Sequence, residues 1–182
     1  MKKLFLLLAI PAAMLFTQCG GGANDEPATV EEETVNLGNT VEIDLSKHGF
    51  PLSIEVPAPD EDTPEATVKA LDWGAVEIRV DKYFQIQIAD GEGNIAAKKQ
   101  NNIDMYDNIY TLEYLVEEET ALLYKTEIHG SGIEPEFHFF AVIKAGGRTF
   151  EIEDIKGEES YSEESARRML DFAKAIKVKT QS

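Results

Sequence analysis

The chain has 182 residues, of which 34 are acidic and 17 are basic, and its formal net charge at pH 7 is −17. This charge repels nucleic-acid phosphates and anionic membrane surfaces. It therefore argues against nucleic-acid binding and against membrane attachment through basic residues. The single cysteine, Cys19, excludes a disulfide within the chain.

Residues 1–19 have the layout of a secretory signal. Lys2 and Lys3 form a cationic start, residues 4–16 are almost entirely apolar, and polar residues precede Cys19. The apolar run is too short for a membrane-spanning helix, which needs about 20 residues. The arrangement resembles a bacterial lipoprotein signal, in which the cysteine is lipidated and becomes the new N-terminus.

The resemblance implies a signal peptide at residues 1–18 and an acyl group such as palmitate on Cys19. Phe16, Thr17 and Gln18 depart from the family pattern of an aliphatic residue, a small residue and then Gly, Ala or Ser. The alternative is an ordinary secreted protein with an unpaired cysteine, but structural cysteines in secreted proteins come in pairs. We therefore expect the lipid bilayer to be a partner through acylated Cys19. The expected location is the bacterial cell envelope, with the outer membrane favoured and the domain in the periplasm or at the cell surface.

Residues 19–40 are predicted to form a flexible acidic tether. Residues 20–22 are glycines, Pro27 breaks regular structure, and residues 31–33 are glutamates that repel one another. The alternative for these acids is an export signal. The rest of the chain, residues 41–182, is predicted to be a single folded domain, because about 160 residues after signal removal can build a core.

Alternating apolar and polar residues predict several strands. Residues 41–45 and 52–56 alternate on either side of a turn. The apolar residues of 75–90 share one parity, which fits either one long strand or a hairpin. We favour the hairpin, because strands longer than about ten residues are uncommon. A three-residue loop at 81–83 would pair Val80 with Phe84, Ile78 with Ile86 and Val76 with Ile88.

Two further hairpins are predicted by matching residues across a turn. A loop at 118–120 would pair Val116 with Leu122, Tyr114 with Tyr124 and Glu113 with Lys125. A two-residue turn at Gly146-Gly147 would pair Ile143 with Phe150 and Ala141 with Ile152.

The apolar spacing of residues 162–177 predicts an amphipathic helix, whose buried stripe is Ala166, Met169, Leu170, Ala173 and Ile176. Asn94 is predicted to cap a short helix over residues 95–102. The order of elements predicts an α+β fold. We expect one antiparallel β-sheet of about 6–8 strands, covered on one face by the C-terminal helix and the short helix.

Residues 49–57, Gly-Phe-Pro-Leu-Ser-Ile-Glu-Val-Pro, and the helix over 165–177 resemble the PsbP-like fold, also found in DcrB-type bacterial lipoproteins. The resemblance implies a non-catalytic accessory role and transfers no residue role.

His138 is the most informative candidate for a polar site, because it shares a predicted strand face with Phe140 and Val142. If strands 121–128 and 136–144 pair, parity allows Glu127 opposite His138. A carboxylate there would orient the imidazole as a general base. No nucleophile accompanies the pair, so a surface His–Glu pair is favoured over catalysis.

Trp73 and Phe140 are candidates for an apolar ligand groove, although a core position for Trp73 is favoured. Residues 90–94 begin like a calcium loop. An EF-hand loop, however, needs glycine at its sixth position and glutamate at its twelfth, where this chain has Ile95 and Asn101. We expect no metal and no cofactor.

The leading functional hypothesis is a membrane-anchored cell-envelope lipoprotein with a non-catalytic binding or accessory domain. Its expected partners are the bilayer and an envelope protein, and not nucleic acid. The alternatives are an envelope hydrolase with His138 as general base and a weak calcium-binding module.

Overall fold

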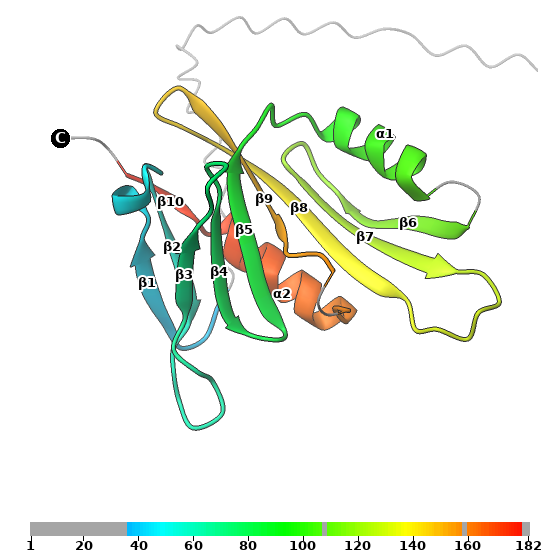
Figure 1. Cartoon of the computed structure of the whole chain (residues 1–182), viewed down its shortest axis with the longest axis horizontal. Coiled ribbons are helices and arrows are strands. Elements are labelled where there is room, and N and C mark those ends of the chain that lie inside the picture. Colours follow the sequence, from blue (N-terminus) through cyan, green and yellow to red (C-terminus); the bar gives the residue numbers. More distant parts are fainter. Residues whose placement is uncertain (1–35, 107–108, 158–159, 180–182) are drawn as a thin grey trace, which may run out of the picture. The chain divides into compact units, whose positions relative to one another are not determined.

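A computed structural model describes residues 36–106, 109–157 and 160–179 (Figure 1). The predicted signal peptide, Cys19 and most of the predicted tether lie outside these residues. In chain order the described elements are β1 (Thr40–Asp44), the 3₁₀ helix η1 (Ser46–His48), β2 (Leu52–Pro57), β3 (Thr67–Ala70), β4 (Val76–Asp81), β5 (Phe84–Asp90), α1 (Ile95–Tyr106), β6 (Tyr110–Glu117), β7 (Ala121–Ile128), β8 (Glu136–Ala145), β9 (Arg148–Asp154), α2 (Glu163–Lys174) and β10 (Lys177–Val178).

The strands form two antiparallel sheets. The larger has seven strands in the order β3-β4-β5-β9-β8-β7-β6, and the smaller has three in the order β1-β2-β10. The α+β class and the antiparallel pairing agree with the sequence analysis. The prediction of a single sheet of about 6–8 strands is wrong, because the strands form two sheets. β1 and β2 pair with each other and not with the large sheet, and β10 is the third strand of their sheet.

The predicted registers are correct within the strands. Three hairpins contain predicted pairs: Val76–Ile88 and Ile78–Ile86, Tyr114–Tyr124 and Glu113–Lys125, and Ile143–Phe150 and Ala141–Ile152. Gly146 and Gly147 form the predicted two-residue turn, and both have positive φ, a backbone conformation that favours glycine.

Two predicted pairs next to turns are wrong. Asp81, not Val80, lies opposite Phe84, because the register shifts between Arg79 and Asp81. Leu123, not Leu122, lies opposite Val116, because a second shift follows Tyr114. Each shift is a β-bulge, which adds one residue to one strand and moves every later pair by one position.

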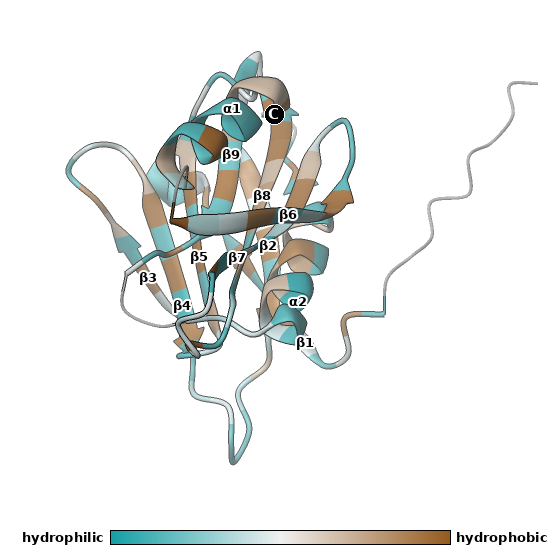
Figure 2. Ribbon diagram, turned by 90° about the vertical axis from the view of Figure 1, so that its right-hand side faces the viewer, coloured by the Kyte–Doolittle hydropathy of each residue, from teal (hydrophilic) through white to brown (hydrophobic). Residues whose placement is uncertain are grey.

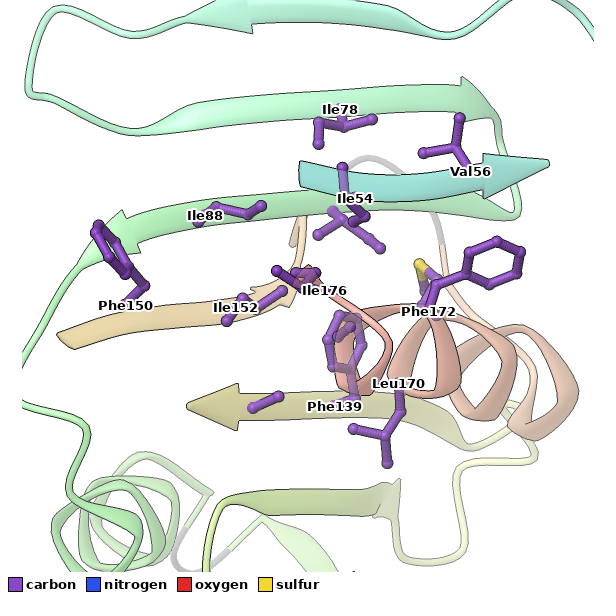
Figure 3. Packing of buried hydrophobic residues seen from close by; sticks show 14 of the residues in the cluster. Ile54, Val56, Ile78, Ile88, Phe139, Phe150, Ile152, Leu170, Phe172 and Ile176 are labelled. Carbon is purple, nitrogen blue, oxygen red and sulfur yellow. The ribbon is translucent and has the colours of Figure 1, made fainter. Parts of the chain in front are cut away.

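The main core lies on one face of the large sheet, under a layer made of α2 and the small sheet (Figure 3). The labelled side chains in Figure 3 belong to one cluster and come from β2, α2, the large sheet and, for Ile176, the segment between α2 and β10. The predicted apolar stripe of α2 is buried, and Phe172 joins it. Its largest fully buried side chains are Tyr161, Phe84, Phe139, Phe150, Phe172, Leu45, Leu52, Ile54, Ile78 and Ile86.

A second apolar cluster lies on the opposite face of the large sheet, beneath α1. It contains Leu122, Tyr124, Phe140 and Val142, and α1 contributes Ile95 and Tyr106 to its margin. Figures 1 and 2 show α1 and α2 on opposite sides of the sheet. The prediction that both helices cover one face is therefore wrong, because β7 and β8 carry apolar side chains on both faces and each face needs a cover.

Both helices begin at polar caps. The Asn94 side-chain oxygen accepts a hydrogen bond from Ala97 N at 3.0 Å, which confirms the predicted cap of α1. The Ser162 hydroxyl accepts one from Ser165 N at 3.2 Å and caps α2. The short helix extends beyond its predicted end at residue 102 to Tyr106, and the C-terminal helix ends at Lys174, before β10.

Candidate functional site

A buried histidine–carboxylate pair lies on the α1 side of the large sheet. His138 Nδ1 and Asp154 Oδ2 are 2.8 Å apart, and the two side chains are 7% and 0% exposed. Such a pair fixes the ring orientation of the imidazole, because one ring nitrogen is committed to the carboxylate. The other nitrogen, Nε2, lies 3.8 Å from the Glu136 carboxylate.

The strand geometry explains the position of Asp154. The paired ladder of β8 and β9 ends at Phe140 and Glu153. One residue further on, Phe139 N donates to the Asp154 carboxylate at 2.9 Å instead of to a backbone carbonyl. The buried carboxylate therefore supplies the acceptor that the ladder no longer provides, and burial without such partners would be costly.

The predicted partnership of His138 with Glu127 is wrong. Tyr124 is the residue opposite His138, and Glu127 lies beyond the last paired position, 3.8 Å from the ammonium group of Lys125. The Glu127 register would have turned Leu122 and Tyr124 away from the apolar face that they share with Phe140. The surface position predicted for His138 is also wrong, because the residue is buried.

Two hydroxyl groups beside this pair have no partner. The Tyr124 ring lies 5.3 Å from the His138 ring, and in the described part of the chain the Tyr124 hydroxyl and Thr126 Oγ1 are buried without a hydrogen bond. Burial and the nearby Asp154 raise the pKa of Tyr124 above its usual range, and they raise the pKa of Tyr106 to about 12. The phenols are therefore neutral donors at physiological pH.

Comparison with protein-family models, curated proteins and solved structures found no match to this chain. Among the described residues, no hydroxyl or thiol is hydrogen-bonded to His138, whose polar partners are Asp154 and Glu136. The arrangement can hold or move a proton at the imidazole, but it presents no attacking group.

The structure does not bring Trp73 and Phe140 together. Trp73 is 63% exposed in the turn between β3 and β4, whereas Phe140 is buried beneath α1. The core position predicted for Trp73 is wrong, because a turn closed by a hydrogen bond from Gly74 N to Leu71 O holds it at the edge of the sheet. The predicted groove between the two residues is therefore wrong as well.

The loop at residues 90–94 is engaged by other groups. The Asp90 carboxylate accepts a hydrogen bond from Arg148 Nε at 2.9 Å, and Gly93 N donates to Glu151 at 2.8 Å. Arg148 holds the pKa of Asp90 below its usual range. Within residues 36–106, 109–157 and 160–179, no group of three or more His, Cys, Asp or Glu residues is placed to hold a metal ion.

Two adjacent lysines of α1 are functional candidates that the sequence analysis missed. Lys98 Nζ lies 2.6 Å from the Glu153 carboxylate and 4.6 Å from the centre of the Phe140 ring. Lys99 forms an ion pair with Glu117, and its ammonium group lies 4.7 Å from the Tyr114 ring centre. The two lysines are adjacent in the sequence. Their aromatic partners, Phe140 and Tyr114, lie on β8 and β6, so these contacts could not be deduced from the lysine pair.

Proposed function

We propose that this protein is a membrane-anchored lipoprotein of the bacterial cell envelope, whose domain binds another envelope component without catalysing a reaction. The observation that supports a binding role is the closed environment of His138: Asp154 is hydrogen-bonded to one ring nitrogen, Tyr124 packs against the ring, and no hydroxyl or thiol of the described residues is hydrogen-bonded to the imidazole. The sequence layout around Cys19 supports the anchor. A tether that ends near Thr40, where β1 begins, would hold the domain away from the bilayer.

Within the described residues, no helix has both the length and the apolar character needed to cross a membrane. Separately, the sequence layout around Cys19 is the basis of the proposed anchor, an acyl group on that residue with additional chains on the same residue, because one acyl chain alone gives marginal binding.

The anchor is tested by mass spectrometry and fractionation of the Cys19→Ser variant beside wild type. The wild-type N-terminus should carry the mass of acyl chains, and high salt should not release the protein from membranes, because a chain at −17 has no electrostatic attraction to an anionic bilayer. The Cys19→Ser protein should be soluble in the envelope fraction or remain an unprocessed precursor. An unmodified wild-type protein that is soluble without detergent would overturn the proposal.

An envelope hydrolase with His138 as base is the second candidate, and the His138–Asp154 hydrogen bond is the observation that favours it. A panel of esterase, peptidase and glycosidase substrates tests it with the full chain. Activity that is lost in His138→Ala but kept in His129→Ala would establish the hydrolase. His129 is the matched control, because it is exposed and contacts Thr111.

A further inference from the structure

The two lysines of α1 occupy sites built from an aromatic ring and a carboxylate. Phe140 of β8 and Glu153 of β9 surround the ammonium group of Lys98, and Tyr114 and Glu117 of β6 surround that of Lys99. A ring face and a carboxylate together are the chemistry that recognises an ammonium ion. We name these two sites the ammonium sites.

The helix that supplies the lysines has fewer buried residues than α2. The only described residue of α1 that is fully buried is Asn102, a polar residue. Ile103 and Met105 are 48% and 64% exposed, so part of the apolar surface of α1 faces solvent instead of the sheet. α2, in contrast, buries five residues in the main core. Removing α1 would therefore cost less apolar burial than removing α2.

The face beneath α1 is also suited to a cationic partner by its charges. Besides Glu153 and Glu117, the Glu136 and Asp154 carboxylates lie near the second cluster, and their charges contribute to raising the pKa of Tyr106 to about 12. The chain as a whole carries −17. Lys156 also lies near Glu153 and Asp154. The four carboxylates named here outnumber it, so a lysine side chain would still find a carboxylate and a ring.

We propose that the face of β6, β8 and β9 beneath α1 is a binding site for a lysine-bearing segment of a partner protein, and that Lys98 and Lys99 fill its two ammonium sites until the partner displaces α1. The inference rests on the proposed role as a binding domain. Competition from α1 lowers the apparent affinity of the site, because only the fraction of molecules with α1 displaced can bind.

The test measures binding of a fluorescently labelled oligolysine peptide to the full chain in non-ionic detergent at physiological salt. Lys98→Ala/Lys99→Ala should bind about tenfold more tightly than wild type, because the competing ammonium groups are gone. The matched control is Lys174→Ala/Lys179→Ala, which removes the same charge and frees Glu118 and Asp44. The control should bind much like wild type. Adding Glu117→Gln and Glu153→Gln to the first variant should remove its gain.

An equal gain in oligolysine affinity in Lys98→Ala/Lys99→Ala and in Lys174→Ala/Lys179→Ala would overturn the proposal, because the peptide would then be attracted by the net charge of the chain alone. No tightening in a folded Lys98→Ala/Lys99→Ala protein would overturn it as well. If that variant does not fold, hydrogen exchange in wild type decides: oligolysine should speed exchange of the α1 amides, and unchanged or slower exchange contradicts the proposal. Neither result affects the acyl mass at Cys19, so failure here is distinguishable from failure of the anchor.

Discussion

The Asp154 carboxylate replaces a backbone acceptor at the point where β9 leaves β8. It also orients His138, so one buried side chain serves both the sheet and the candidate site. The sequence analysis identified His138 from the strand face that it shares with Phe140, but it predicted Glu127 as the partner of His138. Asp154 was missed because it acts from the end of a neighbouring strand, and parity on one strand pair carries no information about such a contact.

Replacing Asp154 by alanine should lower the free energy of unfolding by about 2 kcal/mol or more, because Phe139 N loses its buried acceptor and His138 Nδ1 loses its partner. Asp154→Asn should lose less, since its amide oxygen can still accept from Phe139 N. Urea denaturation measures both variants. Glu136→Ala is the control and should change stability by under about 0.5 kcal/mol. If Asp154→Ala also lowers the free energy of unfolding by under about 0.5 kcal/mol, the Asp154 carboxylate is not a structural acceptor.

Tyr106 should be visible in an alkaline titration. Its pKa is about 12 in the folded protein, against about 10 for an unperturbed tyrosine, because the phenol is partly buried and faces Asp154 and Glu136. The folded state holds this proton more tightly than the unfolded state does. The stabilisation is therefore complete below about pH 10 and is lost as the pH rises from about 10 to about 12.

Ultraviolet absorbance of tyrosinate measures this titration, and Tyr106→Phe should remove a component near pH 12. Tyr83→Phe, at an exposed position, should leave that component in place. Retention of the component in Tyr106→Phe would assign it to another residue.

At the scale of the elements, the alternation of apolar and polar residues predicts which residues pair within a hairpin. It does not predict the bulges near the turns, where one strand has an extra residue. The pairs Ile78–Ile86, Tyr114–Tyr124 and Ile143–Phe150 follow from parity, because two apolar faces must coincide. The bulges near Val80 and Leu115 could not be predicted, because a bulge keeps an apolar sequence pattern while changing which residues face each other.

α2 should be indispensable for folding. Leu170 is buried in the middle of its apolar stripe, so Leu170→Asp places an unpaired charge in the main core at a cost of several kcal/mol. That cost is comparable with the whole stability of a domain, about 5–15 kcal/mol. We expect loss of the cooperative thermal transition in circular dichroism. Lys174→Ala, which breaks an exposed ion pair with Glu118, should melt close to wild type. Similar melts for both variants would show that α2 is not docked.

At the scale of the whole molecule, the sequence analysis did not predict that the large sheet lies between two layers, with α1 on one face and α2 with the small sheet on the other. The signal was present in the sequence, because Leu122, Phe140 and Val142 form an apolar face opposite the main core and such a face needs a cover. α1 is a poor match to an amphipathic pattern, since Ile103 and Met105 are exposed and Asn102 is buried. Its place over the second face could therefore not be deduced from its own sequence.

The net charge and the exposed Trp73 give a whole-molecule test. Trp73 is 63% exposed and is the only tryptophan in the sequence, so native fluorescence should already resemble that of a tryptophan in water. At a net charge of −17, the ratio of caesium to iodide quenching should be higher than the ratio for free N-acetyltryptophanamide at low salt, and the difference should shrink as salt screens the charge. Acrylamide, which is neutral, is the control. A ratio equal to that of the free analogue at low salt would contradict the expected negative potential around the domain.

The small sheet joins an early part of the chain to a late one, because β10 pairs Lys177 with Ser53 of β2. The hairpins from β6 to β9 join neighbouring segments and should form quickly, whereas contacts between distant segments must first overcome the entropy of closing a long loop. Ile54 and the inner face of β2 belong to the main core, to which both the large sheet and α2 contribute. A nascent chain therefore carries an incompletely covered apolar core until α2 has been made, and protection from aggregation matters most before that point.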